Sequence, residues 1–208
     1  MSSLQGSKFF SSMDLASAFW QIPMDEASKD LTTFVEPGGT WRYKNMPFGL
    51  INGPATFSRF IDQVLTGLKW RTCLIYMDDV LIHTATMSDH VDAIIEVFGR
   101  IDKYGLRFKP KKCFICVDSV QFLGHVVTRD GITSDPAKVK AIKEMPFPED
   151  KEHMKSALGL FSYYRKFVKG FAKIAHPLTQ RMKQDSILPR DENGKVVWSK
   201  EEREALRF

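Results

Sequence analysis

The chain has 208 residues, 43% of them hydrophobic, so it is long enough for one sizeable core or for one domain and a smaller one. No stretch reaches the roughly 20 apolar residues of a membrane span, and residues 1–10 lack the apolar core of a secretory signal. Cys73, Cys113 and Cys116 favour a reducing compartment over a disulfide framework, and a single C-x-x-C spacing is a weak signal for zinc. These features predict an intracellular protein.

The net charge of +5 is unevenly distributed along the chain. Residues 1–128 carry thirteen basic and thirteen acidic side chains, whereas residues 129–208 carry seventeen and twelve. Between His153 and Gln184 there are seven Lys or Arg residues and no Asp or Glu. A basic stripe without counter-charges favours a polyanion such as nucleic acid as partner; a solvated helix face is the alternative.

The first expected element in chain order is a strand from Phe9 that ends at Asp14, followed by a turn or short helix. Asp14 is equally consistent with a carboxylate at a strand end and with a helix N-cap. A hairpin is expected over residues 31–44, around the turn residues Pro-Gly-Gly.

A loop is expected over residues 46–54, which contain two glycines and two prolines. Pro54 suits the first turn of a helix from Ala55 to about Thr66. The glycines permit close approach to a planar ligand, and a simple connection into the helix is the equally good alternative.

Residues 74–82, LIYMDDVLI, contain two short apolar runs around an acidic tip, which predicts a hairpin. An ordinary turn is the simplest explanation of Asp78 and Asp79. The tip nevertheless lacks the Gly or Asn that a two-residue turn prefers, so we expect a strained turn. Adjacent carboxylates raise each other's pKa, and Mg²⁺ would relieve their repulsion.

A helix is expected from about residue 89 to Tyr104, with its buried face listed in order as Val91, Ile94, Ile95, Phe98 and Ile101. Residues 106–112 are basic and predicted to be extended, and residues 122–127 are predicted to form another strand. The turn at Asp130-Gly131 is a plausible domain boundary.

From Asp135 onwards the pattern predicts helices, over about residues 136–145, 150–168 and 171–182. Residues 184–197 are expected to form a polar loop before an amphipathic helix begins at Trp198. The whole pattern predicts an α+β fold: an antiparallel sheet with helices on one face, followed by a small helical domain.

Asp14 and the Asp78-Asp79 pair lie 64 residues apart, each at the end of an expected strand. Neighbouring antiparallel strands would bring the three carboxylates to one edge of the sheet. Two Mg²⁺ ions held there could activate a 3′-hydroxyl and stabilise a leaving pyrophosphate during in-line phosphoryl transfer. Lys109, Lys111 or Lys112 could then meet a triphosphate.

Five ordered motifs resemble the reverse transcriptase of a gypsy-class LTR retrotransposon Pol polyprotein. They are FFSSMDLASAFWQIPM, NMPFGLINGPATFSRFID, YMDD, FLGH and LGLFSYYRKFVKGFAKIAHPLT. The resemblance covers almost the whole chain. It implies a polymerase palm over residues 1–128 with most of the fingers missing, a helical thumb over 129–183, and a linker with the start of a truncated ribonuclease H-like region over 184–208.

The resemblance also implies site residues, named by their position in this sequence. Asp14, Asp78 and Asp79 would be the catalytic carboxylates and hold two Mg²⁺ ions, with Mn²⁺ as a substitute. The nucleotide would lie against Leu15, Phe19, Phe48, Gly49 and Lys111, with Phe19 blocking a ribose 2′-hydroxyl. Lys111 is the preferred proton donor to pyrophosphate. The primer would contact Tyr76, Met77, Phe122, Leu123, Gly124 and His125, and the nucleic-acid backbone would contact Lys155, Arg165, Lys166, Lys169 and Lys173.

The implied partners are an RNA or DNA template with its primer, deoxynucleoside triphosphates, and a parent polyprotein with protease, ribonuclease H and integrase regions. No membrane partner is expected, and the implied location is a cytoplasmic virus-like particle. Because only thirteen residues precede Asp14, we expect an intact palm with poor or no activity alone. The competing hypotheses are an inactive nucleic-acid-binding remnant and another two-metal palm enzyme such as a cyclase, against which the basic C-terminal half argues.

Overall fold

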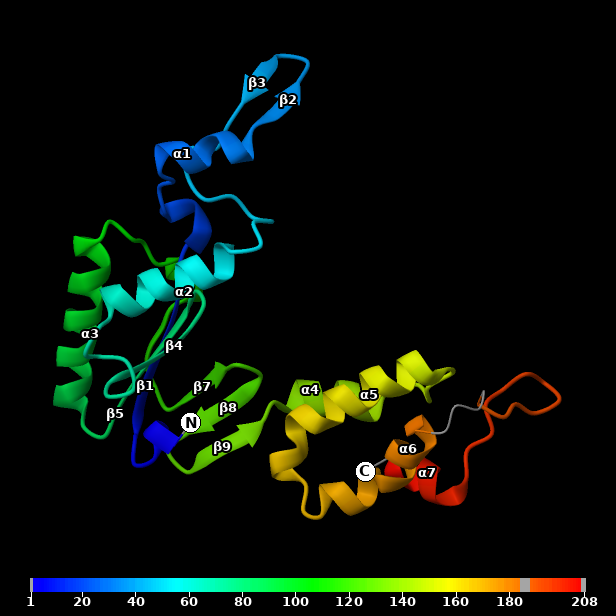
Figure 1. The fold of residues 1–208 in the computed structure, drawn as a ribbon. Coiled ribbons are helices and arrows are strands. Elements are labelled where there is room, and N and C mark those ends of the chain that lie inside the picture. Colours follow the sequence, from blue (N-terminus) through cyan, green and yellow to red (C-terminus); the bar gives the residue numbers. More distant parts are fainter. Residues whose placement is uncertain (1, 184–187, 207–208) are drawn as a thin grey trace. The chain divides into compact units, whose positions relative to one another are not determined.

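The computed structural model describes residues 2–183 and 188–206 (Figure 1). The chain divides into two compact units, Met1–Ile132 and Thr133–Phe208. Helices and antiparallel sheets occur together, which confirms the predicted α+β class. Residues 184–187 and 207–208 of the predicted C-terminal region lie outside the described residues. The functional division at residues 128 and 183 stays a prediction.

The first unit is built on a four-stranded antiparallel sheet with the strand order β4-β5-β1-β6. The strands are β1 (Phe9–Asp14), β4 (Cys73–Tyr76), β5 (Asp79–Thr84) and β6 (Phe114–Val117). Strands β1 and β5 pair along their whole length, from Phe9 opposite Thr84 to Asp14 opposite Asp79. The strand expected to end at Asp14 and the hairpin expected over residues 74–82 are therefore confirmed.

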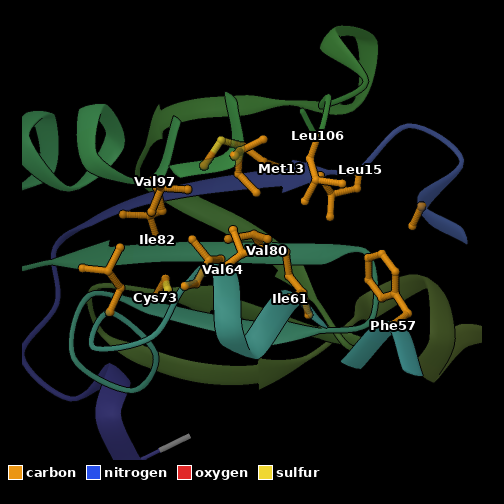
Figure 2. Packing of buried hydrophobic residues seen from close by; sticks show 14 of the residues in the cluster. Met13, Leu15, Phe57, Ile61, Val64, Cys73, Val80, Ile82, Val97 and Leu106 are labelled. Atoms are coloured by element: carbon orange, nitrogen blue, oxygen red, sulfur yellow. The ribbon is translucent and has the colours of Figure 1, made fainter. Parts of the chain in front are cut away.

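Helices α2 (Gly53–Val64) and α3 (Met87–Lys103) pack on one face of this sheet. Phe57, Ile61 and Val64 of α2 belong to the same core cluster as Val80 and Ile82 of the sheet, and Figure 2 shows Val64 and Ile61 beside Val80. The three α2 residues recur at helical spacing, which gives the helix one apolar face. The predicted helix is confirmed, with a start two residues earlier than expected.

The other face of the sheet is covered by a second hairpin, β7 (Ser119–Phe122) and β8 (His125–Thr128). Phe10 and Leu81 of the sheet pack with Val120 and Val127 of the hairpin. Side chains alternate between the two faces of a strand, so β1 contributes Phe10 to this cluster and Met13 to the main core. With apolar side chains packed on both faces, β1 lies in the interior of the unit.

The buried face of α3 differs from the prediction. It consists of His90, Ala93, Val97 and Ile101, and of the expected set only Ile101 is fully buried. Ile95 is 65% exposed. The face is rotated because His90, a polar residue that hydropathy excludes from a core, is fully buried and hydrogen-bonded by Ser11 and Thr84. The helix was therefore predicted correctly, but the residues assigned to its buried face were wrong.

Short elements lie between β1 and α2. They are η2 (Ala18–Gln21), α1 (Glu26–Lys29), η3 (Asp30–Thr32), β2 (Phe34–Glu36) and β3 (Gly39–Trp41), and η1 (Ser2–Leu4) precedes β1. The predicted hairpin is present as β2–β3 but is shorter, since residues 31 and 32 belong to η3. All residues of β2 and β3 are exposed.

Two further predictions in this unit need correction. The segment expected to be extended contains η4 (Pro110–Lys112), because proline favours the first turn of a helix. Residues 122–125 are not one strand: Leu123 and Gly124 both have positive φ, 51° and 72°, and form the tight turn between β7 and β8. Strand β9 (Gly131–Ser134) completes this three-stranded sheet after the predicted turn.

The second unit is helical, as predicted, with α4 (Pro136–Lys143), α5 (Lys151–Tyr164), η5 (Arg165–Phe167), α6 (Phe171–Lys183) and α7 (Lys200–Ala205). Asp135, Asp150 and Ser199 cap three of these helices with side-chain acceptors, which satisfies backbone N–H groups at the helix starts. Met154 and Leu178 are completely buried in its core. Among the described residues, no helix combines the length and apolar character that crossing a bilayer requires.

Candidate active site

Three aspartates from distant parts of the sequence meet at one end of the central sheet. Asp14 is the last residue of β1 and lies directly opposite Asp79, the first residue of β5. The backbone N–H of Leu15 donates to the carbonyl oxygen of Asp78 at 3.0 Å, so the third aspartate is held beside the same strand end. The expected convergence of Asp14, Asp78 and Asp79 is present in the structure.

The turn that carries the acidic tip is strained. Met77 and Asp78 connect β4 to β5, and Met77 has a φ of 54°, in the left-handed region that L-residues avoid at a cost of about 1–2 kcal/mol. The Ser58 hydroxyl of α2 lies 3.9 Å from the Met77 sulfur. The sequence prediction of a strained turn is confirmed.

The electrostatics of the site are those of crowded like charges with one cation beside them. The pKa of Asp79 is raised, first because the carboxyl is partly buried and then because Asp78 and Asp14 are negative. The ammonium of Lys112 lies 2.7 Å from Asp14 Oδ2 and opposes this shift. Its own pKa is raised by the hydrogen bond and charge of Asp14.

Lys112, rather than Lys111, is the lysine that reaches the carboxylates. The backbone N–H of Lys109 donates to the Asp14 carbonyl at 2.8 Å, and η4 then turns Lys112 back toward Asp14. Lys109 and Lys111 are exposed and form no ion pair within the part of the chain that the structure describes. The sequence alone did not indicate which of the adjacent lysines contacts Asp14, because the turn of η4 was not predicted.

The three carboxylates supply hard oxygen donors, the type that Mg²⁺ prefers. Within residues 2–183 and 188–206, however, no three His, Cys, Asp or Glu side chains are arranged as a metal-binding group. One oxygen of Asp14 is bonded to Lys112 instead. The donor set therefore suits a divalent cation chemically, and a cation at Asp14 would compete with the Lys112 ammonium.

Aromatic residues from the segment after Asp14 form a cluster with later parts of the chain. Phe19 of η2 contacts Phe48 with ring centroids 5.3 Å apart and Phe57 of α2 at 5.7 Å. Trp20 lies 6.1 Å from Phe48, whose side chain is 64% exposed. Gly49 has a φ of 92°, a conformation that favours glycine and turns the loop after Phe48. The predicted nucleotide residues Phe19, Phe48 and Gly49 therefore lie together.

Other predicted nucleotide and primer residues are divided between surface and core. Tyr76 is exposed beside the acidic tip. Leu15, Phe122 and His125 are buried, so their side chains stabilise the unit. In the β7–β8 turn, Leu123 and Gly124 are partly buried, and Leu123 packs against the cluster around Phe10. The sequence motif thus marks a hairpin whose two ends are anchored in the core.

The predicted backbone-binding residues form a basic set in the second unit. All are exposed, and they lie on α5, η5, α6 and the segment between η5 and α6: Lys155, Arg165, Lys166, Lys169 and Lys173. The Lys166 ammonium lies 4.8 Å from the centre of the Phe167 ring. No acidic residue occurs in the sequence between residues 154 and 183, so this stretch of the chain has a net positive charge.

One polar residue near the site, Gln21, was not predicted from the sequence motifs. The side-chain amide of Gln21 bonds to backbone groups of Ala16 and Arg107, on either side of the acidic strand end. A glutamine between apolar residues carries no recognisable signal, because two of its three bonds are to backbone groups of Arg107, 86 residues away.

The fold and the site together define the class of protein: it is an α+β domain whose antiparallel sheet ends in clustered carboxylates next to exposed aromatic rings. Residues 1–127 match the family model described as "Reverse transcriptase (RNA-dependent DNA polymerase)". The chain therefore belongs to the reverse transcriptase family, as its motifs indicated.

Curated relatives are Pol polyproteins of LTR retrotransposons. The chain is 41% identical over 177 residues to the "Retrovirus-related Pol polyprotein from transposon 297" of Drosophila melanogaster, covering 85% of this chain and 17% of that protein. It is 39% identical over 196 residues to the polyprotein from transposon gypsy of the same species, covering 94% and 18%. The chain thus spans less than a fifth of these relatives.

Solved structures of foamy viral protease-reverse transcriptase are similar to the chain. The protein described as "foamy viral protease-reverse transcriptase dRH", solved in complex with double-stranded DNA, has a TM-score of 0.83 at 26% identity. The similarity covers 96% of this chain and 34% of the other. The complex with an RNA/DNA hybrid has a TM-score of 0.78 at 26% identity, with 96% and 26% covered.

Proposed function

We propose that the chain is the polymerising part of a retrotransposon Pol polyprotein, an RNA-directed DNA polymerase that adds deoxynucleotides to a primer 3′-hydroxyl. The observation that carries this proposal is the convergence of Asp14, Asp78 and Asp79 at one sheet end. Membership of the reverse transcriptase family supports it. An inactive remnant is disfavoured because a decayed site has no reason to retain all three carboxylates and the lysine that neutralises them.

Asp14, Asp78 and Asp79 would hold two divalent cations, Mg²⁺ or Mn²⁺, which when bound supply activation of the hydroxyl and neutralisation of the pyrophosphate charge. The pKa of Asp79 is raised first by burial and then by the charges of Asp78 and Asp14, and such binding would relieve the repulsion between these charges. The ammonium of Lys112, 2.7 Å from Asp14 Oδ2, neutralises part of this charge. We infer that Lys112 leaves Asp14 when substrate binds.

The reaction balances without covalent participation of the protein. The primer 3′-hydroxyl loses its proton to water and its oxygen attacks the α-phosphorus, the bond from that phosphorus to the bridging oxygen breaks, and pyrophosphate leaves. Lys112 would give the leaving group a proton, because it is the lysine whose ammonium lies at the carboxylates, 2.7 Å from Asp14 Oδ2. This assignment replaces Lys111 in that role.

The remaining residues would position substrates. Phe19 would exclude a ribose 2′-hydroxyl, and Phe48 and Gly49 would lie against the nucleotide and template. Tyr76, Met77 and the Leu123-Gly124 turn would support the primer, with Phe122 and His125 anchoring that turn from the core. The basic set of the second unit would track the duplex backbone without reading sequence.

The wider assignments follow from the family. Residues 1–128 would be the palm, 129–183 the thumb, and 184–208 a linker leading toward a ribonuclease H region. The parent polyprotein would supply protease and integrase, and a cytoplasmic virus-like particle would be the site of action. The foamy viral relatives solved with double-stranded DNA and with an RNA/DNA hybrid support a primed template as partner.

The test is primer extension on an RNA template with Mg²⁺, using the chain joined to the preceding segment of its own reading frame. Asp78→Asn is expected to reduce extension by at least about a thousandfold. Asp92→Asn, which neutralises an exposed aspartate on α3, is the matched control and should leave the rate unchanged. Equal rates for Asp78→Asn and the parent would refute the polymerase assignment.

A further inference from the structure

A side-chain amide joins the turn after Asp14 to the segment that leads to Lys112. Gln21 is the last residue of η2. Its Nε2 donates to the carbonyl oxygens of Ala16 at 2.6 Å and Arg107 at 3.1 Å, and its Oε1 accepts from the backbone N–H of Arg107 at 2.6 Å. The amide thus pairs with both backbone groups of Arg107, as a peptide group of a neighbouring strand would.

Backbone bonds extend this junction to the acidic site. The Ala16 N–H donates to the Arg107 carbonyl at 2.9 Å, and the Lys109 N–H donates to the Asp14 carbonyl at 2.8 Å. The segment containing Arg107 and Lys109 is therefore aligned with the chain from Asp14 to Ala16. Gln21 adds the tie between this aligned pair and the far end of η2.

The element held in this way carries Phe19. The Phe19 ring is otherwise placed by packing against Phe57, which is completely buried, and Phe48, which is largely exposed on a glycine-containing loop. Ring packing is non-directional and permits sliding, whereas three hydrogen bonds to fixed backbone groups define the orientation of η2. Gln21 therefore limits how far Phe19 moves relative to Asp14.

We propose that Gln21 is a positioning residue for sugar selection: its amide bonds to Ala16 and Arg107 hold η2 so that the Phe19 ring stands at a fixed distance from Asp14. The inference rests on the proposed polymerase function. It predicts that loss of the Gln21 hydrogen bonds raises the rate of ribonucleotide incorporation, while the rate of deoxynucleotide incorporation changes less. Gln21 itself touches neither substrate nor reacting atoms.

Two near-isosteric substitutions separate hydrogen bonding from packing. Gln21→Met keeps the volume and loses all three bonds. Gln21→Glu keeps the acceptor for the Arg107 N–H but directs a negative charge at two carbonyl oxygens. Gln63→Met, at an exposed position on α2, is the matched control. A residue that merely fills space would tolerate Gln21→Met, and Gln21→Glu would have no specific effect on sugar discrimination.

The experiment measures the ratio of deoxynucleotide to ribonucleotide incorporation in the same extension assay, together with hydrogen exchange of the Arg107 amide. Both Gln21 variants are expected to lower the ratio by at least about fivefold, with Gln21→Met also accelerating exchange of the Arg107 amide, and Gln63→Met is expected to change neither. An unchanged ratio in active Gln21 variants overturns the inference alone. An inactive parent enzyme overturns the proposed function and the inference with it.

Discussion

Ser11→Ala is the substitution whose cost follows most directly from the structure. Ser11 is completely buried in the middle of β1, the strand that ends at Asp14. Its hydroxyl shares a hydrogen bond with His90 Nε2 at 2.7 Å and accepts from the Cys116 N–H at 2.9 Å. Ser11 therefore ties β1 to α3 on one side and to β6 on the other.

Removing this hydroxyl leaves one nitrogen of the completely buried His90 without a partner, which costs about 1–3 kcal/mol. Loss of the bond from the partly buried Cys116 N–H adds about 0.5–1.5 kcal/mol. We therefore expect the free energy of unfolding to fall by about 2–4 kcal/mol, a large share of the roughly 5–15 kcal/mol of a typical domain.

Urea unfolding followed by tryptophan fluorescence measures this loss. The control is Ser12→Ala, one residue further along β1, where the half-buried hydroxyl has no hydrogen-bond partner among the described residues. That change is expected to alter stability by less than about 0.5 kcal/mol. Equal losses for Ser11→Ala and Ser12→Ala would refute the role assigned to the buried network.

Three further outcomes are expected. Burial lowers the pKa of His90 below its unfolded value of 6.5. Its contribution to stability is therefore complete above that pH and is lost as the pH falls through the folded pKa. A urea midpoint that rises as the pH is lowered from about 7.5 to about 5.5 would contradict this. Lys112→Met should slow nucleotide addition at least about tenfold more than Lys111→Met in single-turnover assays, and equal slowing would remove Lys112 from the mechanism. Glu202→Gln should destabilise the second unit by about 3 kcal/mol in urea titrations, because Glu202 is buried against Arg181 at 3.1 Å; a loss below about 0.5 kcal/mol would contradict the importance of that ion pair.

Local sequence patterns predicted most of the elements that position the acidic site. The runs around Asp78-Asp79 are apolar and partly β-branched, and the run before Asp14 begins with two phenylalanines; such short runs have few alternatives to buried strands. Pairing of these strands follows from the need to satisfy their backbone groups, and it places the carboxylates together. The α+β class and the helical second unit follow from the same periodicity.

The errors arise where a polar group replaces an apolar one or where the chain turns. His90 is absent from any hydrophobic pattern, yet buried hydroxyls make it a core residue and rotate α3 around it. The choice of Lys112 depends on the turn of η4, and the role of Gln21 depends on backbone groups distant in sequence. These are long-range hydrogen-bonding effects, which residue periodicity does not encode.

Binding of Mn²⁺ to the purified chain, measured by the loss of the free-ion paramagnetic resonance signal, tests most directly whether Asp14, Asp78 and Asp79 act as one cation site. The account predicts that the parent chain and Asp92→Asn bind Mn²⁺ alike and that Asp78→Asn binds it at least about tenfold more weakly. Unchanged affinity in Asp78→Asn would contradict the shared site and, with it, the mechanism built on these carboxylates.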